Sequence, residues 1–183
     1  NPLAQTLYSE LGHYSPRTRF VEVFIQDGSG AAGPLTSANY YGLYVLEEKI
    51  KIGNDRVDIP KLQPENTNAP SVTGGYLLSI DKSNPGSPMY VADAAIWNLD
   101  PDYYEISARP AQAQYIYNYF NSFYTALYSS TWTHPVTGYA PYIDLDSWID
   151  SHLHETLMFN ADALRISTYF YKPRNGPIVQ GPL

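Results

Sequence analysis

The fold is decided by residues 144–171, which read DLDSWIDSHLHETLMFNADALRISTYFY. Asp144 is a good N-cap residue, because its side chain can accept a hydrogen bond from the first backbone N–H groups of a helix. Apolar positions then recur every three or four residues, the spacing of a buried helical stripe; they are Leu145, Trp148, Ile149, Leu153, Thr156 and Leu157. This pattern predicts a helix that ends near Asn160, followed by an alternating strand over residues 165–171.

A strand hairpin and a second helix are predicted on either side of this segment. Asn175-Gly176 is typical of a tight turn, and residues 178–180 begin a return strand. Upstream, residues 111–128 carry apolar side chains at helical spacing. The second half of the chain is therefore expected to be mainly helical and to end in a β-hairpin.

The first half has the pattern of strands and turns. A short helix is expected over residues 2–12, and residues 60–70 predict a mobile surface loop rich in Pro and Asn. Strands rich in β-branched and aromatic residues are predicted over residues 20–25, 40–46, 74–81 and 89–96. The whole pattern predicts an α+β domain, strand-rich first and helix-rich second.

The composition is that of one globular domain. The chain has 183 residues, of which 44% are hydrophobic and 16% charged. The net charge of −7 disfavours nucleic acid as a partner, and the absence of cysteine excludes disulfides and thiolate metal sites. No apolar run is long enough to predict a membrane span. The 18 tyrosines fit either a semi-polar core or a surface that contacts carbohydrate or protein.

The segment 160–167 is the candidate for chemistry. A carboxylate in a short loop after a rigid helix can be aimed at a substrate, and in protein kinases such an Asp accepts the proton of the attacking hydroxyl. In protein kinases, a polar residue five positions after this Asp helps to hold the metal ion. Asp162 and Ser167 have this spacing. From spacing alone, the simpler interpretation is that Asp162 and Asn160 cap the chain where the helix ends.

Several segments resemble the CotH-type (spore-coat protein H) kinase family and occur in the family's order. They cover nearly the whole chain and comprise residues 16–21, 41–50, 55–59, 74–81, 143–148 and 160–172. The resemblance implies an atypical protein-kinase-like fold. It also implies transfer of phosphate from ATP, with magnesium or manganese, to Ser or Thr hydroxyls of a coat or surface protein.

The resemblance also implies roles for single residues. Asp162 matches the catalytic Asp of the family's Asn-x-Asp motif, and Ser167 stands where some members have a metal-binding Asn. Ser79 lies near the expected position of a phosphate-gripping Lys, and Lys82 is the nearest basic substitute. Glu48 closes the Tyr-Gly-Leu-Tyr strand and is a candidate to pair with a nucleotide-binding cation; the alternative is an ordinary solvated charge cluster.

The expected domain is a single CotH-kinase-like unit truncated at both ends. Residues 1–98 form its mainly β part, and residues 99–183 form its mainly α part with the catalytic-loop-like segment 160–167. By the resemblance, the chain begins after the family's first strands and stops before a Trp-Asp-x-Asp-like motif that carries the metal-binding Asp.

The location and an alternative function follow from the same resemblance. We expect the protein outside the bacterial cytoplasm, in a spore coat, a secreted matrix or another cell-surface assembly. The alternative to a kinase is a catalytically inactive structural or adhesive module, which binds an assembly partner and contacts glycans through its tyrosines.

Overall fold

The computed structural model describes the chain except for residues 27, 29–32, 81–88, 93–94, 100–108 and 164. The helices are α1 (Pro2–Glu10), α2 (Pro110–Leu127) and α3 (Leu145–Leu157). The strands are β1 (Thr18–Phe24), β2 (Tyr40–Glu47), β3 (Tyr76–Ile80), β4 (Met89–Ala92), β5 (Ala95–Leu99), β6 (Thr168–Lys172) and β7 (Val179–Gln180). This architecture confirms the α+β class. In the described part of the chain, no helix has the length and apolar character needed to cross a membrane.

The larger sheet joins both halves of the chain. Its strand order is β4-β5-β3-β6-β7, and all of its pairings are antiparallel. Leu78 of β3 lies opposite Phe170 of β6, so strands from the first and second halves share one core. The expectation of one strand over residues 89–96 is wrong, because β4 and β5 are separate strands that pair with Ala92 opposite Ala95.

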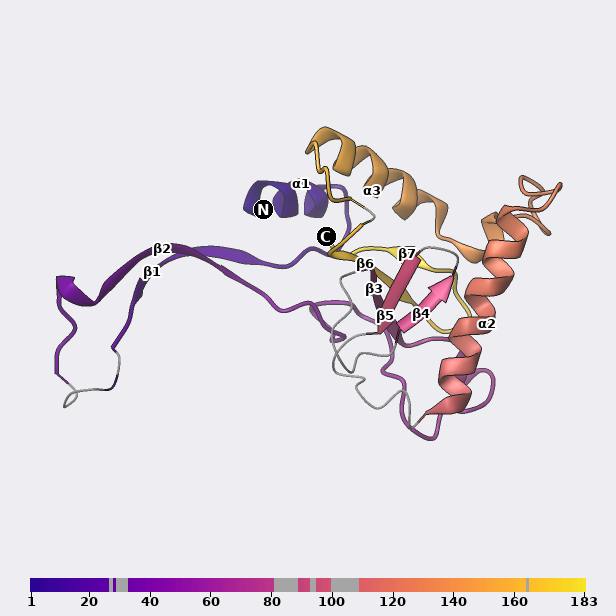
Figure 1. Cartoon of the computed structure of the whole chain (residues 1–183), viewed down its shortest axis with the longest axis horizontal. Coiled ribbons are helices and arrows are strands. Elements are labelled where there is room, and N and C mark those ends of the chain that lie inside the picture. Colours follow the sequence, from indigo (N-terminus) through magenta and orange to yellow (C-terminus); the bar gives the residue numbers. More distant parts are fainter. Residues whose placement is uncertain (27, 29–32, 81–88, 93–94, 100–108, 164) are drawn as a thin grey trace.

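The core lies on both faces of β3. Successive side chains of a strand point to opposite faces, and in this strand all of them except the half-buried Ser79 are buried. On one face, Leu78 and Phe170 belong to a cluster that also includes Ile116 and Phe120 of α2. On the other face, Leu77 packs with residues of the 52–59 loop. Figure 1 shows α2 running alongside this sheet.

Helix α3 begins as predicted but turns a different face to the core. The Asp144 carboxylate accepts a hydrogen bond from the Ser147 N–H at 3.0 Å, which confirms the N-cap. The predicted burial of the Leu and Ile stripe is wrong: these side chains are 42–74% exposed, and they are Leu145, Ile149, Leu153 and Leu157. The buried face instead carries Ser147, Ser151 and His154.

Polar contacts explain why α3 buries its Ser and His side chains instead of its Leu and Ile stripe. The Ser147 hydroxyl accepts a hydrogen bond from the Gln180 N–H of β7 at 3.1 Å. One turn from the end of the helix, the His154 Nε2 lies 2.9 Å from the Ala4 carbonyl oxygen of α1. Small hydroxyl side chains allow the helix to approach strand backbone closely, so hydrogen bonding selects the face that packs and the apolar stripe faces solvent.

Strands β1 and β2 form a ribbon that extends away from the rest of the molecule (Figure 1). Among the described residues they pair only with each other, with Phe20 opposite Val45 and Glu22 opposite Leu43. Large apolar side chains such as Phe20 and Leu43 are exposed along this β1–β2 ribbon. A two-stranded ribbon alone is marginally stable in water, so its attachment at the base matters.

Lys172 is a buried cation at the end of β6. Its side-chain ammonium donates hydrogen bonds to the carbonyl oxygens of Thr73 at 2.6 Å and Gly176 at 2.7 Å, and it lies 4.4 Å from the centre of the Tyr119 ring. Burial disfavours the charged form and lowers the pKa of Lys172 from 10.5 to about 8. The side chain thus ties the β6–β7 turn to the loop before β3.

Replacing Lys172 is expected to change how stability depends on pH. Between about pH 8 and pH 10.5 the unfolded chain holds this proton and the folded chain does not, so raising the pH through this window stabilises the folded wild type. Lys172→Met has no titratable group at this position, so its stability does not gain this contribution as the pH rises. The measurement is urea unfolding across the window, with the exposed Lys51→Met as control. Parallel curves for wild type and Lys172→Met would contradict this assignment.

Candidate functional site

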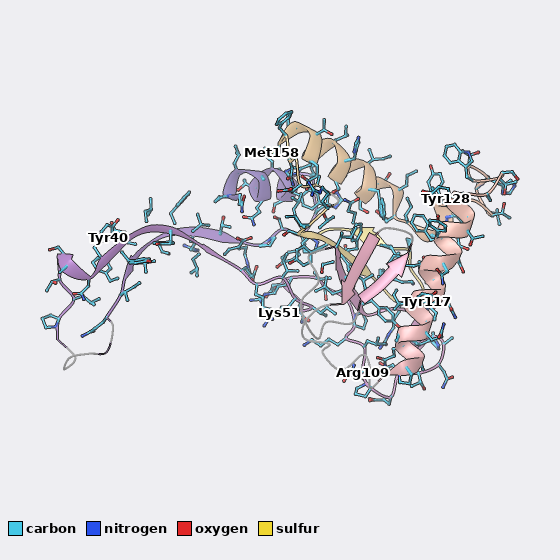
Figure 2. All side chains as sticks on the ribbon, viewed as in Figure 1. Tyr40, Lys51, Arg109, Tyr117, Tyr128 and Met158 are labelled. Atoms are coloured by element: carbon cyan, nitrogen blue, oxygen red, sulfur yellow. The ribbon has the colours of Figure 1, made fainter. Side chains whose placement is uncertain are left out.

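A cavity of about 740 Å³ opens where α3 ends. Its walls come from α1, the end of β2, the last turn of α3 and the segment that follows α3. Met158 is one of its lining residues, and Figure 2 labels it beside the end of α3 and close to α1. Segments distant in sequence therefore meet at the loop that the sequence singled out.

The loop after α3 holds Asp162 in the wall of this cavity. The helix is terminated by Phe159, whose φ of 53° is left-handed. The Asn160 side-chain oxygen then accepts a hydrogen bond from the Asp162 N–H at 3.1 Å, and the Asp162 carbonyl accepts one from the Arg165 N–H at 3.0 Å. Asn160 thus caps the turn, whereas the exposed Asp162 carboxylate has no hydrogen-bond partner among the described residues.

Ser167 lines the same cavity as Asp162. Its φ of 54° places it in the left-handed region immediately before β6 begins. The structure therefore brings together the two residues that the five-residue spacing selected. The role of Ser167 as a metal ligand stays a prediction.

Two further carboxylates line the cavity wall. Glu47, the last residue of β2, accepts a hydrogen bond from the Gln5 side chain of α1. Glu155 lies in the last turn of α3, and its Oε2 atom is buried without a partner in the described part of the chain. Glu155 and Asp162 both lie close in sequence to the end of α3, whereas nothing local connects Glu47 to this loop.

The cavity is acidic. Its described lining includes the carboxylates of Glu47, Glu155 and Asp162 and contains no Lys or Arg. Such oxygen-rich walls fit a hard divalent cation such as Mg²⁺, which binds through one or two carboxylates and substrate phosphates. Among the described residues, however, no three His, Cys, Asp or Glu side chains are already arranged around one metal position.

Glu48 lies in an ion-pair cluster at the base of the β1–β2 ribbon. Its carboxylate is 2.6 Å from the Arg17 guanidinium and 2.8 Å from that of Arg56, and the Tyr14 hydroxyl donates to it at 3.3 Å. Hydrogen bonding from Arg17 lowers the pKa of Glu48 to about 2. Glu48 is not among the residues that line the cavity, and its proposed contact with a nucleotide-binding cation stays a prediction.

Ser79, near the expected position of the phosphate-gripping Lys, lies near the end of β3. Ser79 is opposite Tyr169 of β6, and Tyr169 lines the cavity, so the end of β3 runs close behind this wall. Lys82 lies outside the described residues. The part of the chain that the structure describes therefore gives the cavity carboxylates and hydroxyls, while the phosphate-binding cation stays a prediction at Lys82.

A family model described as CotH kinase protein matches residues 1–182, which is essentially the whole chain. No curated protein and no solved structure matches the chain.

Proposed function

Because the chain belongs to the CotH kinase family, we propose that it transfers phosphate from ATP to Ser or Thr hydroxyls of a coat or surface protein. The observation that carries this proposal is the Asp162 carboxylate, which stands in a cavity wall at the end of a helix and is not used by the turn that holds it. The helix that precedes this loop is anchored by polar contacts to β7 and α1.

Asp162 acts as the base in this proposal. The substrate hydroxyl attacks the γ-phosphorus of ATP, its proton passes to the Asp162 carboxylate, and ADP leaves with the electron pair of the broken P–O bond. The Asn160 side chain fixes the backbone of Asp162 and thereby its direction. A positioned base of this kind typically raises the reaction rate by a factor of about 10²–10⁴.

Ser167 and Glu155 are the residues proposed to hold a divalent cation. Both line the cavity, and Glu155 has a buried carboxylate oxygen without a partner among the described residues. When bound, magnesium or manganese supplies positive charge to the transferring phosphate. Lys82 is proposed as the protein's own cation for the phosphates, and Glu48 as its acidic partner.

A labelling experiment tests the proposal. The intact protein is incubated with γ-labelled ATP and Mn²⁺ or Mg²⁺, with casein as a hydroxyl-bearing acceptor, and phosphoserine and phosphothreonine are quantified by acid hydrolysis. We expect metal-dependent labelling that EDTA abolishes. Absence of transfer together with absence of ATP–metal binding by calorimetry would reject the kinase assignment.

A second candidate function is supported by the surface of the molecule. The apolar side chains of the β1–β2 ribbon and the Leu/Ile stripe of α3 are exposed, as expected for a protein that becomes covered in an assembly. The acidic cavity wall, which has no Lys or Arg among its described lining residues, also suits a scaffold that does not bind nucleotide. On this alternative, a surface or coat assembly module, the protein fails to bind ATP and self-associates or binds a partner.

A further inference from the structure

A second hollow lies on α2, separate from the Asp162 cavity. It has a volume of about 640 Å³ and shares no lining residue with that cavity. One wall is a side of α2, where residues 118, 121, 122 and 125 recur at helical spacing; the other wall is the loop over residues 129–142. In Figure 2, Tyr128 at the end of α2 and Met158 at the Asp162 cavity lie well apart. We call this hollow the α2 groove.

The lining of the α2 groove is neutral and rich in hydrogen-bonding groups. Apart from Ala126, every lining side chain is an amide, an aliphatic hydroxyl or a phenol: Asn118, Asn121, Ser122, Thr125, Ser129, Thr131, Thr137 and Tyr142. Four of these side chains make no hydrogen bond to any described residue, and they are Asn121, Ser122, Thr125 and Thr137. Each can both donate and accept, so the groove offers paired donors and acceptors to a ligand.

The loop wall of the groove is held by its own hydrogen bonds. The His134 Nδ1 accepts hydrogen bonds from the N–H groups of Val136 and Thr137, each at 3.2 Å. The Tyr139 N–H closes the loop onto the Trp132 carbonyl at 3.0 Å. The Tyr119 hydroxyl of α2 donates to the Tyr142 carbonyl at 3.0 Å, which joins the two walls. A wall fixed before binding loses less entropy when a ligand arrives.

The loop that forms one wall of the groove also carries an aromatic pair, Trp132 and Tyr139, which are not themselves lining residues. Trp132 follows the lining residue Thr131 and is 49% exposed. Its ring stacks on Tyr139, with centroids 5.9 Å apart and planes inclined by 22°. An exposed aromatic face, supported from behind, provides apolar area beside a polar groove at low entropic cost.

From these features we propose that the α2 groove binds a neutral oligosaccharide. Sugar rings carry many hydroxyls that donate and accept, which matches the amide and hydroxyl lining, and their apolar faces pack on aromatic rings such as Trp132. The lining has no charge to compensate an ionic ligand, and the chain's net charge of −7 disfavours acidic polysaccharides. A volume of this size suits a ligand of a few sugar units. This inference is independent of the kinase proposal.

The test is titration of the full chain with cellohexaose, maltohexaose and chitohexaose, followed by calorimetry and by NMR of the Asn side-chain amides. We expect saturable binding of at least one of them. Asn121→Ala and Thr125→Ala are each expected to weaken it about two- to tenfold, the effect of one or two lost hydrogen bonds. Trp132→Ala is expected to weaken binding of the same ligand at least as strongly.

Two features keep this experiment decisive. Alanine has a higher helix propensity than Asn or Thr, so both α2 variants are expected to fold at least as well as the wild type. Asn54→Ala, an exposed amide outside the groove, is the matched control and is expected to bind normally. Absence of saturable binding to all three hexasaccharides, or equal binding by the groove variants and the wild type, would overturn the proposal.

Discussion

Asp162→Asn is expected to lower the rate of phosphate transfer about a hundred- to ten-thousand-fold, or 10²–10⁴. Asparagine has nearly the same shape as aspartate but cannot take up the proton of the attacking hydroxyl. The Asp162 side chain is exposed and makes no hydrogen bond to the described residues, so the variant disturbs no contact of the fold. The rate is measured as phosphoserine and phosphothreonine formed from labelled ATP under saturating metal.

Asp146→Asn is the matched control for this experiment. Asp146 is an exposed carboxylate in the first turn of α3 and does not line the cavity, so its variant is expected to retain activity. Far-UV circular dichroism of both variants checks the fold. Equal rates for Asp162→Asn and wild type would remove Asp162 from the mechanism, even if transfer by the wild type were confirmed.

Phe170→Ala is expected to destabilise the fold by about 3–5 kcal/mol, the usual effect of truncating a fully buried phenylalanine. Phe170 is completely buried and sits in β6 between β3 and β7. Its ring centre is 5.4 Å from that of Trp148 on α3, so the residue connects the sheet to the helix that carries the Asp162 loop. Because most domains are stable by only about 5–15 kcal/mol, this variant is expected to lose function through partial unfolding.

Urea unfolding followed by tryptophan fluorescence measures this loss, and Trp148 reports on the affected core. Phe20→Ala is the matched control, because the Phe20 side chain on the β1–β2 ribbon is 68% exposed. Its effect is expected to stay within about 0.5 kcal/mol. A cost below about 1 kcal/mol for Phe170→Ala would show that this residue is not at the centre of the core.

Local signals in the sequence predicted most of the elements. The N-cap at Asp144 and the turn at Asn175-Gly176 depend on neighbouring residues, and the structure confirms both. The burial of the α3 stripe could not be predicted, because it depends on hydrogen bonds from Ser147 and His154 to segments far away in the chain. Helical periodicity identifies an apolar face but not what covers it.

The candidate site divides in the same way. Asp162 and Ser167 were selected by their spacing within one loop, and the structure places both in one cavity wall. Glu47 reaches that wall only because β2 returns past α1, which the sequence does not reveal. The acidic character of the cavity is therefore a tertiary property of the chain.

The β1–β2 ribbon leaves two open ladders of backbone N–H and C=O groups, one along each outer edge, because among the described residues these strands pair only with each other. An extended segment of another polypeptide could add to either edge through main-chain hydrogen bonds alone, without any change in the domain behind it.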